Sequence, residues 1–262
     1  MSKFSKKMYN KYKKSKSSAL LVYFILRSLV ILCAIGEFIN GNVGNVVLCI
    51  ISLILFTVPT FIEEKMQIEL PNALELLVYI FIFSSEILGE INNFYGIIPY
   101  WDTMLHAING FLCAGIGFSL VDILNKNSKR ISLSPIYVAI VAFCFSMTIG
   151  VCWEFIEYAA DNYLDADMQK DRIVNKINSV KLNENNENVP VIINDISSTT
   201  IKTNDGNVIV IDNGYLDIGL IDTMKDLFVN FIGAIIFSVM GGIYIKNRDK
   251  NSFINNFIIR RG

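Results

Sequence analysis

Six stretches of about 20 mostly apolar residues dominate the hydrophobic pattern of this chain, and 20 such residues are what a helix needs to cross a membrane. They cover residues 19–39, 44–62, 71–91, 103–124, 133–158 and 222–245. Only helices and closed barrels satisfy their own backbone in lipid, and these stretches do not alternate as barrel strands do. The pattern predicts an all-α polytopic membrane protein with about six transmembrane helices.

Prolines mark the ends of two of these stretches. Pro59 lies near the end of the second stretch, where it should kink or end the helix. Ser134 and Pro135 lie at the start of the fifth stretch, where they fit the N-cap and the first helical residue.

The segment between the fifth and sixth stretches, residues 162–220, has a different pattern. It is first rich in Asn, Asp and Lys and then alternates, with many β-branched residues. Asn204-Asp205-Gly206-Asn207 followed by Val208-Ile209-Val210-Ile211 is typical of a hairpin. We therefore expect a small β-rich insertion. A flexible linker is the alternative, since two or three strands alone are marginally stable.

Composition and charge support a membrane protein and give it an orientation. The chain is 53% hydrophobic and only 18% charged. Seven lysines lie in the first 18 residues and five basic residues follow residue 245, whereas the loops at 40–45 and 92–101 have none. Basic loops stay in the cytoplasm. Both termini should therefore be cytoplasmic, in a bacterial plasma (inner) membrane, with the lipid bilayer as the main partner.

These features divide the chain into five parts. We expect a basic cytoplasmic segment at 1–18, five transmembrane helices within 19–161, an extracytoplasmic insertion at 162–220, a sixth helix at 221–245 and a cytoplasmic tail at 246–262. A cleavable signal peptide is the alternative for the start, but the apolar run is long and Arg27 interrupts it. We expect no nucleic-acid partner, because lysines tethered beside a membrane span suit the anionic lipid surface.

Polar and small side chains follow one face of each of the last three stretches. The three stripes are Asp102, His106, Asn109, Cys113 and Gly117; Gly150, Glu154, Glu157 and Asp161; and Asp222, Asp226, Asn230 and Gly233. In the expected orientation, all three acidic ends lie at the outer leaflet. Small residues allow helices to approach closely, so we expect the stripes to pack together with up to six acids around the single histidine.

Several carboxylates crowded in this way need a counter-charge. Protonated acids, a protonated imidazole or a bound cation would each reduce the repulsion between these carboxylates. Oxygen-rich ligation with one imidazole favours Mg, Mn, Ca or Fe over structural zinc, so a divalent cation is the cofactor that the residues allow. The alternative is that the acids are solvated at the headgroups or cap helix starts. The candidate metal ligands are Glu154, Glu157, Asp222 and Asp226.

Three ordered blocks resemble the YjdF-like bacterial inner-membrane proteins, an uncharacterised family that is distantly similar to VanZ-like proteins. The blocks are residues 100–106 (YWDTMLH) with Gly110-Phe111, residues 153–158 (WEFIEY), and residues 222–226 (DTMKD) with Gly233-Ala234. The resemblance implies a loose link to the cell envelope, and its pattern matches six residues of the stripes: Asp102, His106, Glu154, Glu157, Asp222 and Asp226. The insertion is longer here than in that family.

Two classes of function follow from these residues. In the first, the site is a cation-dependent enzyme acting on a lipid-linked or envelope substrate, with His106, Asp102 and Asp226 as the catalytic residues and His106 as general acid or base. In the second, the site binds a cation or proton during transport, although the inner halves of the stripes are small and apolar. A non-catalytic membrane scaffold or resistance protein is a third hypothesis.

Overall fold

The computed structural model describes residues 18–127, 133–185, 187–247 and 252–261. The predicted basic segment at 1–18 therefore lies outside the described residues except for Ser18. The chain divides into two compact units. We call Met1–Gly150 with Phe228–Gly262 the helical unit, and Val151–Leu227 the insertion unit. The boundary falls within two continuous helices, α8 (Pro135–Leu164) and α9 (Leu220–Asn247).

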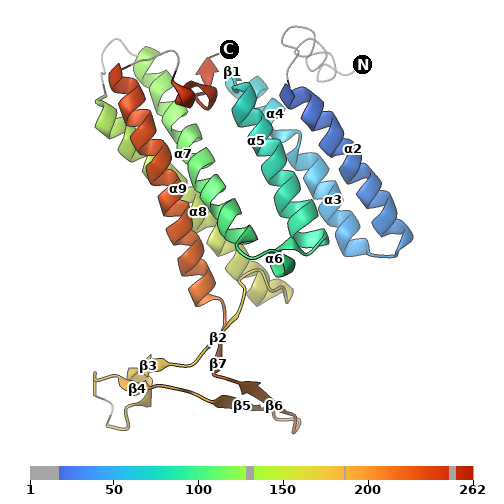
Figure 1. Cartoon of the computed structure of the whole chain (residues 1–262), viewed down its shortest axis with the longest axis vertical. Helices are drawn as coiled ribbons and strands as arrows, with labels where there is room; N and C mark the ends of the chain where they lie inside the picture. Colours follow the sequence, from blue (N-terminus) through green and yellow to red (C-terminus); the bar gives the residue numbers. More distant parts are fainter. Residues whose placement is uncertain (1–17, 128–132, 186, 248–251, 262) are drawn as a thin grey trace. The chain divides into compact units, whose positions relative to one another are not determined.

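The helical unit contains nearly all of the apolar sequence. Besides its parts of α8 and α9, its described elements are α2 (Ser18–Ile39), α3 (Val43–Leu55), α4 (Val58–Met66), β1 (Ile68–Glu69), α5 (Asn72–Ile82), η1 (Phe83–Ile91), α6 (Phe94–Ile97), α7 (Trp101–Asn127), η3 (Phe253–Asn256) and β8 (Arg260–Arg261). Figure 1 shows α2, α3 and α5 side by side.

Five helical segments among the described residues are long and apolar enough to cross a membrane. They are Ser18–Ile39, Val43–Met66, Trp101–Lys126, Pro135–Leu164 and Leu220–Asn247. The remaining predicted stretch, at 71–91, is also helical, but it changes from the α-helix α5 to the π-helix η1 at Phe83. The prediction of an all-α polytopic membrane protein is confirmed.

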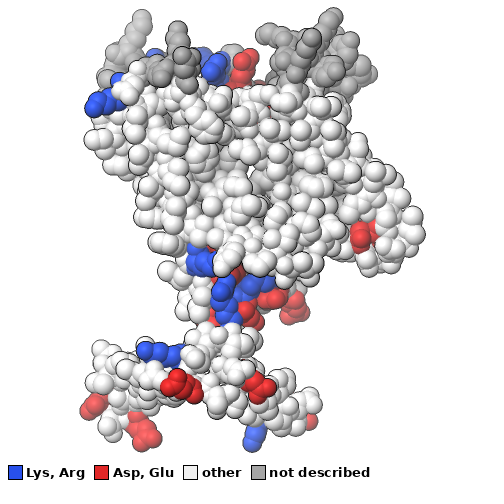
Figure 2. Space-filling model, in the orientation of Figure 1, with Lys and Arg blue, Asp and Glu red and all other residues white. Residues whose placement is uncertain are grey.

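The surface of the helical unit suits a lipid bilayer. Large apolar side chains such as Leu32, Phe38 and Ile54 are exposed. The helices show a face almost free of charged side chains (Figure 2). Because exposed apolar area of this extent is unfavourable in water, the bilayer is the environment in which these helices are stable.

One hydrophobic core joins α2, α3, α5 and η1. Its centre is an aromatic cluster in which the Tyr79 ring centroid lies 5.2 Å from that of Tyr23 and 5.8 Å from that of Phe56. The Tyr79 hydroxyl donates a hydrogen bond of 2.8 Å to buried Glu75, and Arg27 donates to the Tyr23 hydroxyl. Buried polar groups need such partners, so the tyrosines hold Glu75 and the partly buried Arg27 beside this core.

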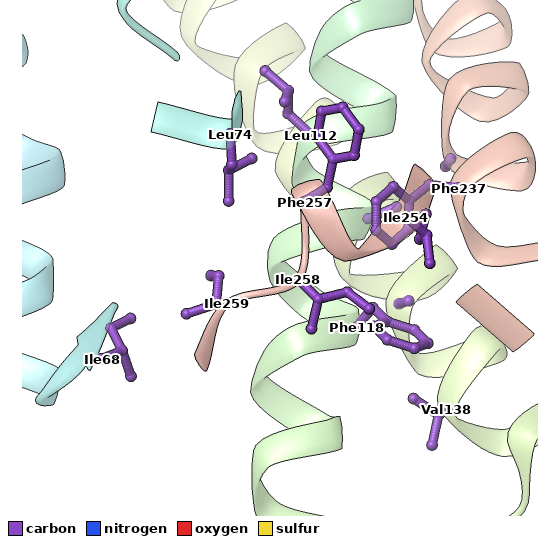
Figure 3. Close-up of a cluster of buried hydrophobic side chains, with 13 residues drawn as sticks. Ile68, Leu74, Leu112, Phe118, Val138, Phe237, Ile254, Phe257, Ile258 and Ile259 are labelled. Atoms are coloured by element: carbon purple, nitrogen blue, oxygen red, sulfur yellow. The ribbon is translucent and has the colours of Figure 1, made fainter. Parts of the chain in front are cut away.

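A second core joins α7, α8, α9 and the start of α5. It contains Leu74, Phe118, Val138 and Phe237, together with apolar residues from the C-terminal end of the chain (Figure 3). The predicted tail at 246–262 is therefore, in its described part, a packed element of the helical unit.

The insertion unit contains short strands rather than an unstructured linker. Its described elements, besides parts of α8 and α9, are β2 (Arg172–Val174), β3 (Ile177–Ser179), η2 (Val180–Leu182), β4 (Val191–Ile193), β5 (Ser198–Lys202), β6 (Val208–Asp212) and β7 (Tyr215–Asp217). They form three antiparallel pairs, β2 with β7, β3 with β4, and β5 with β6. The hairpin predicted at residues 204–207 joins β5 to β6, and Gly206 has the positive φ of 91° that its turn requires.

Candidate functional site

The first residues of α7 position the aspartate and the histidine singled out by the sequence. The Trp101 indole donates a hydrogen bond of 3.3 Å to the Ser84 carbonyl of η1, and its ring meets Phe94 edge-on at 5.0 Å between centroids. These contacts hold the start of the helix. Asp102 lies in the first turn of α7, and His106 follows one turn later.

Asp102 and His106 lie in contact within the helical unit. One Asp102 oxygen, Oδ1, lies 3.4 Å from Nε2 of His106. The His106 side chain is buried, whereas that of Asp102 is partly exposed. A carboxylate at this position orients the imidazole ring, which a general acid or base requires. The i, i+4 spacing in the sequence therefore corresponds to a real pair.

A buried amide network continues this polar face along α7 and joins three helices. Asn230 of α9 is fully buried and accepts a hydrogen bond of 3.3 Å from the Asn109 amide. Its own amide donates to the Ser146 carbonyl of α8 at 3.5 Å. The Ser146 hydroxyl donates to the Gly110 carbonyl at 2.8 Å. Each helix is thus tied to the other two, about one turn from His106.

Glycines allow the backbones of these helices to approach each other at the network. A Cβ added at Gly110 would lie 2.2 Å from the Asn230 carbonyl oxygen, and one added at Gly233 would lie 2.2 Å from the Ala107 carbonyl oxygen. At Gly150 it would lie 2.7 Å from the Asn230 amide nitrogen. The expected packing of the three small-residue stripes is therefore present in the helical unit.

The four candidate metal ligands lie on α8 and α9 within the insertion unit, and all four are buried. They are Glu154, Glu157, Asp222 and Asp226. Glu157 accepts a hydrogen bond of 2.7 Å from the Trp153 indole. Asp226, which is 1% exposed, has Lys225 Nζ at 3.7 Å from its Oδ1. Acids buried to this degree carry a large desolvation cost, which distinguishes them from solvated headgroup-level acids.

Asp161, at the far end of the α8 stripe, holds a turn of the insertion. Its two carboxylate oxygens accept hydrogen bonds from the backbone nitrogens of Met168 at 2.6 Å and Gln169 at 2.8 Å. We call residues 168–172 the anchor segment. A carboxylate that accepts two backbone N–H groups has a structural role in the loop that returns on it.

Asp222 holds the other side of the same segment. It accepts the Lys170 backbone N–H at 3.0 Å and pairs with Arg172 at 3.7 Å. Beside it, the Gln169 amide donates to the Thr223 hydroxyl. Within the insertion unit, the anchor segment therefore connects the end of α8 to the start of α9.

The anchor segment gives a first prediction. Asp161→Ala removes the acceptor of two partly buried backbone N–H groups, and a donor left unsatisfied away from water costs about 1–3 kcal/mol. Hydrogen exchange of residues 165–175 should therefore become at least about tenfold faster, since about 1.4 kcal/mol corresponds to a factor of ten. Limited proteolysis should cut the insertion sooner while helix content stays unchanged. Glu187→Ala, at an exposed position of the same unit, should leave both measurements unchanged. Equal protection in both variants would contradict this role of Asp161.

Comparison with known proteins identifies the family. The profile described as "Predicted membrane protein (DUF2238)" matches residues 20–247. The chain belongs to the DUF2238 family. An uncharacterized protein of Thermotoga maritima is 31% identical over 113 residues, which are 43% of this chain and 57% of that relative. The match thus covers a little over half of the relative's length. No solved structure matches the chain.

This DUF2238 protein also has residues beside the site that the three predicted stripes do not include. Ser146 is one of them, and its hydroxyl donates to the Gly110 carbonyl of α7. Its spacing of four residues from Gly150, and of eight from Glu154, would have placed it on the α8 stripe. Trp101 holds the start of α7, and Trp153 donates a hydrogen bond to Glu157. These two residues are harder to recognise as functional from the sequence, because aromatic residues near helix ends are also common at membrane interfaces.

Proposed function

We propose that this membrane protein binds a divalent cation at the acidic ends of α7, α8 and α9, and that the site is a cation-dependent enzyme acting on a lipid-linked or envelope substrate. The observation that carries the proposal is the Asp102–His106 pair, whose buried imidazole lies 3.4 Å from the carboxylate. A buried histidine beside a carboxylate in a membrane helix is costly and usually serves a function. The buried amide network beside it gives that pair a rigid support.

Helical periodicity supports the participation of acids from α8 and α9. Glu154 follows Gly150 by four residues on α8, and Asp226 precedes Asn230 by four residues on α9. Gly150 and Asn230 pack directly against each other in the helical unit. Residues four apart lie on one face of a helix, about 6 Å apart along its axis. We therefore assign Glu154 and Asp226 as the inner cation ligands.

Glu157 and Asp222 take outer positions in this proposal. Glu157 already accepts from the Trp153 indole, and Asp222 from the Lys170 backbone. Carboxylates that ligate metals are commonly oriented by such hydrogen bonds, because a carboxylate has a second oxygen for the cation. These two residues complete the proposed set of Glu154, Glu157, Asp222 and Asp226 and connect it to the insertion.

The chemistry proposed for this set is hydrolysis or group transfer at a polar headgroup or envelope intermediate. A divalent cation held by carboxylates lowers the pKa of bound water and polarises a phosphoryl or carbonyl oxygen. His106, oriented by Asp102, transfers the proton as general acid or base. A transporter is less well supported, because Ala114, Phe118 and Phe237 continue the same helices as fully buried apolar side chains.

The proposal also places the site on one side of the membrane. Basic residues at the opposite end of α7 and in the C-terminal strand, namely Lys126, Arg260 and Arg261, support a cytoplasmic position for that end. The acidic ends of the helices and the insertion then face the outside of a bacterial plasma membrane. The resemblance to YjdF-like and VanZ-like envelope proteins agrees with this location.

Metal analysis tests the proposal directly. Protein purified without chelator should retain a divalent cation in a ratio near one per chain, measured by mass spectrometry of the metal. Treatment with a chelator should lower the unfolding temperature, and Mg²⁺, Mn²⁺ or Ca²⁺ should restore it, because a ligand that binds only the folded state stabilises it. Protein that holds no cation, and whose unfolding is unaffected by chelators and by these ions, would exclude the cation site.

A further inference from the structure

The C-terminal end of the chain returns to the helical unit and fills its core. We call residues 252–261 the C-terminal segment. Four apolar side chains of this segment are between 1% and 5% exposed, namely Ile254, Phe257, Ile258 and Ile259. In Figure 3, the segment passes between β1 and α5 on one side and α7 on the other. A short segment without α-helix thus supplies much of the apolar filling at this end of the unit.

Specific contacts hold this segment on both sides. On one side, β8 pairs antiparallel with β1, so that Arg261 lies opposite Ile68 and Arg260 opposite Glu69. On the other side, the Ile259 backbone N–H donates a hydrogen bond of 2.9 Å to the hydroxyl of fully buried Ser119 in α7. The C-terminal segment therefore connects the α5 side of the helical unit to the α7 side.

The packing of the segment is incomplete at its polar edge. A cavity of about 260 Å³ lies beside it, lined by residues 69–73 and by Asn255, Asn256 and Arg260. Amide and charged side chains make this cavity accessible to water. Water can thus reach the edge of the segment, where separation from β1 requires only the short β1–β8 pairing to break.

We propose that the C-terminal segment is a removable plug, which closes a groove between β1, α5 and α7 and opens that groove to the aqueous phase when it leaves. The conformational entropy lost on ordering about ten residues offsets much of the gain from burying four apolar side chains. The pairing of β1 with β8 covers only two residues of each strand, so few backbone hydrogen bonds oppose release of the segment. This plug is independent of the proposed cation site and goes beyond that function.

Accessibility of Ser119 tests the plug. Ser119→Cys in the full chain should react slowly with a water-soluble maleimide, measured against the labelling of the unsubstituted protein with its five cysteines. Removing residues 252–262 should raise the rate of labelling at this position at least tenfold. Unchanged labelling in a truncated protein that keeps its helix content would overturn the proposal, because the groove would then be closed without the segment.

A point substitution covers the case in which the truncated chain does not fold. Ile258→Asn places an amide at a buried position of the plug, whereas Ile243→Asn makes the same change at an exposed position of α9. The first should raise labelling of the Ser119→Cys protein severalfold and the second should not. Equal labelling would identify the segment as a permanent part of the core. His106→Gln should leave labelling unchanged, which separates this test from that of the cation site.

Discussion

Gly110→Ala is expected to prevent α7 and α9 from packing as they do. The added methyl group would lie 2.2 Å from the backbone carbonyl oxygen of Asn230, and a backbone atom cannot move aside as a flexible side chain can. Overpacking of this kind costs on the order of 3 kcal/mol. Separation of the helices would also break the hydrogen bonds of Asn230 to Asn109 and Ser146. Thermal unfolding in detergent should show a fall of many degrees, or the protein should fail to purify as a single species.

Gly36→Ala is the matched control for this substitution. Gly36 also lies within a transmembrane helix, α2, but a Cβ there would meet nothing within 4 Å. Alanine is favoured over glycine in a helix by about 0.5–1 kcal/mol, so this variant should be neutral or slightly more stable. The two identical chemical changes should therefore have opposite signs. Similar unfolding temperatures for both would mean that α7 and α9 do not approach closely at Gly110.

Asp226→Asn should abolish tight cation binding while leaving the protein as stable or more stable. The amide keeps the size of the carboxylate but removes the negative charge that a divalent cation requires, so affinity should fall at least about tenfold, or about 1.4 kcal/mol. Asp226 is 1% exposed, and its charged carboxylate carries a desolvation cost that a neutral amide lacks, even with Lys225 Nζ at 3.7 Å. Stability in the presence of chelator should therefore rise, as is common when a functional residue is replaced. Isothermal titration calorimetry with Mn²⁺ measures the affinity for the cation, and thermal unfolding in the presence of chelator measures the stability.

Asp167→Asn removes the same charge from an exposed position, since the Asp167 side chain is 69% exposed. It should change neither the affinity for the cation nor the unfolding temperature. A purely structural Asp226 predicts a different outcome, namely that Asp226→Asn lowers stability with and without cation. The sign of the stability change with chelator present therefore separates a ligand from a structural acid.

Most of the helical architecture followed from local sequence signals. Pro59 was expected to kink or end the second helix, and α3 indeed ends at Leu55 with Pro59 at the start of α4. The Ser134 hydroxyl accepts the Tyr137 backbone N–H at 3.2 Å, as an N-cap does, and α8 begins at Pro135. Such signals depend only on neighbouring residues, so a single sequence is sufficient to reveal them.

Other parts of the fold depend on contacts between distant residues and were not foreseen. The change from α5 to the π-helical η1 at Phe83 has no proline or glycine to mark it. The C-terminal segment has too few residues for a helical or strand period, and its burial depends on contacts with Ile68 and Ser119, more than 100 residues earlier. Tertiary contacts of this kind cannot be derived from periodicity.

Some contacts of the candidate site could likewise be predicted from the sequence, and others could not. The Asp102–His106 pair and the Asn109–Asn230 contact follow from helical spacing and the positions of small residues. The roles of Asp161 and Asp222 do not, because their partners are backbone N–H groups of the anchor segment rather than side chains. Backbone donors are present at every residue except proline, so a sequence cannot single them out.

The pairing of β2 with β7 has a consequence for the evolution of this family. Arg172 lies opposite Asp217, and Val174 opposite Tyr215, so the chain leaves this ladder and returns to it at neighbouring points. Opposite residues of an antiparallel pair lie about 4.5–5.5 Å apart, a gap that a two-residue turn can close. Everything between Val174 and Tyr215 can therefore be deleted, lengthened or exchanged without moving α8 or α9. Homologues should differ in length chiefly at this point.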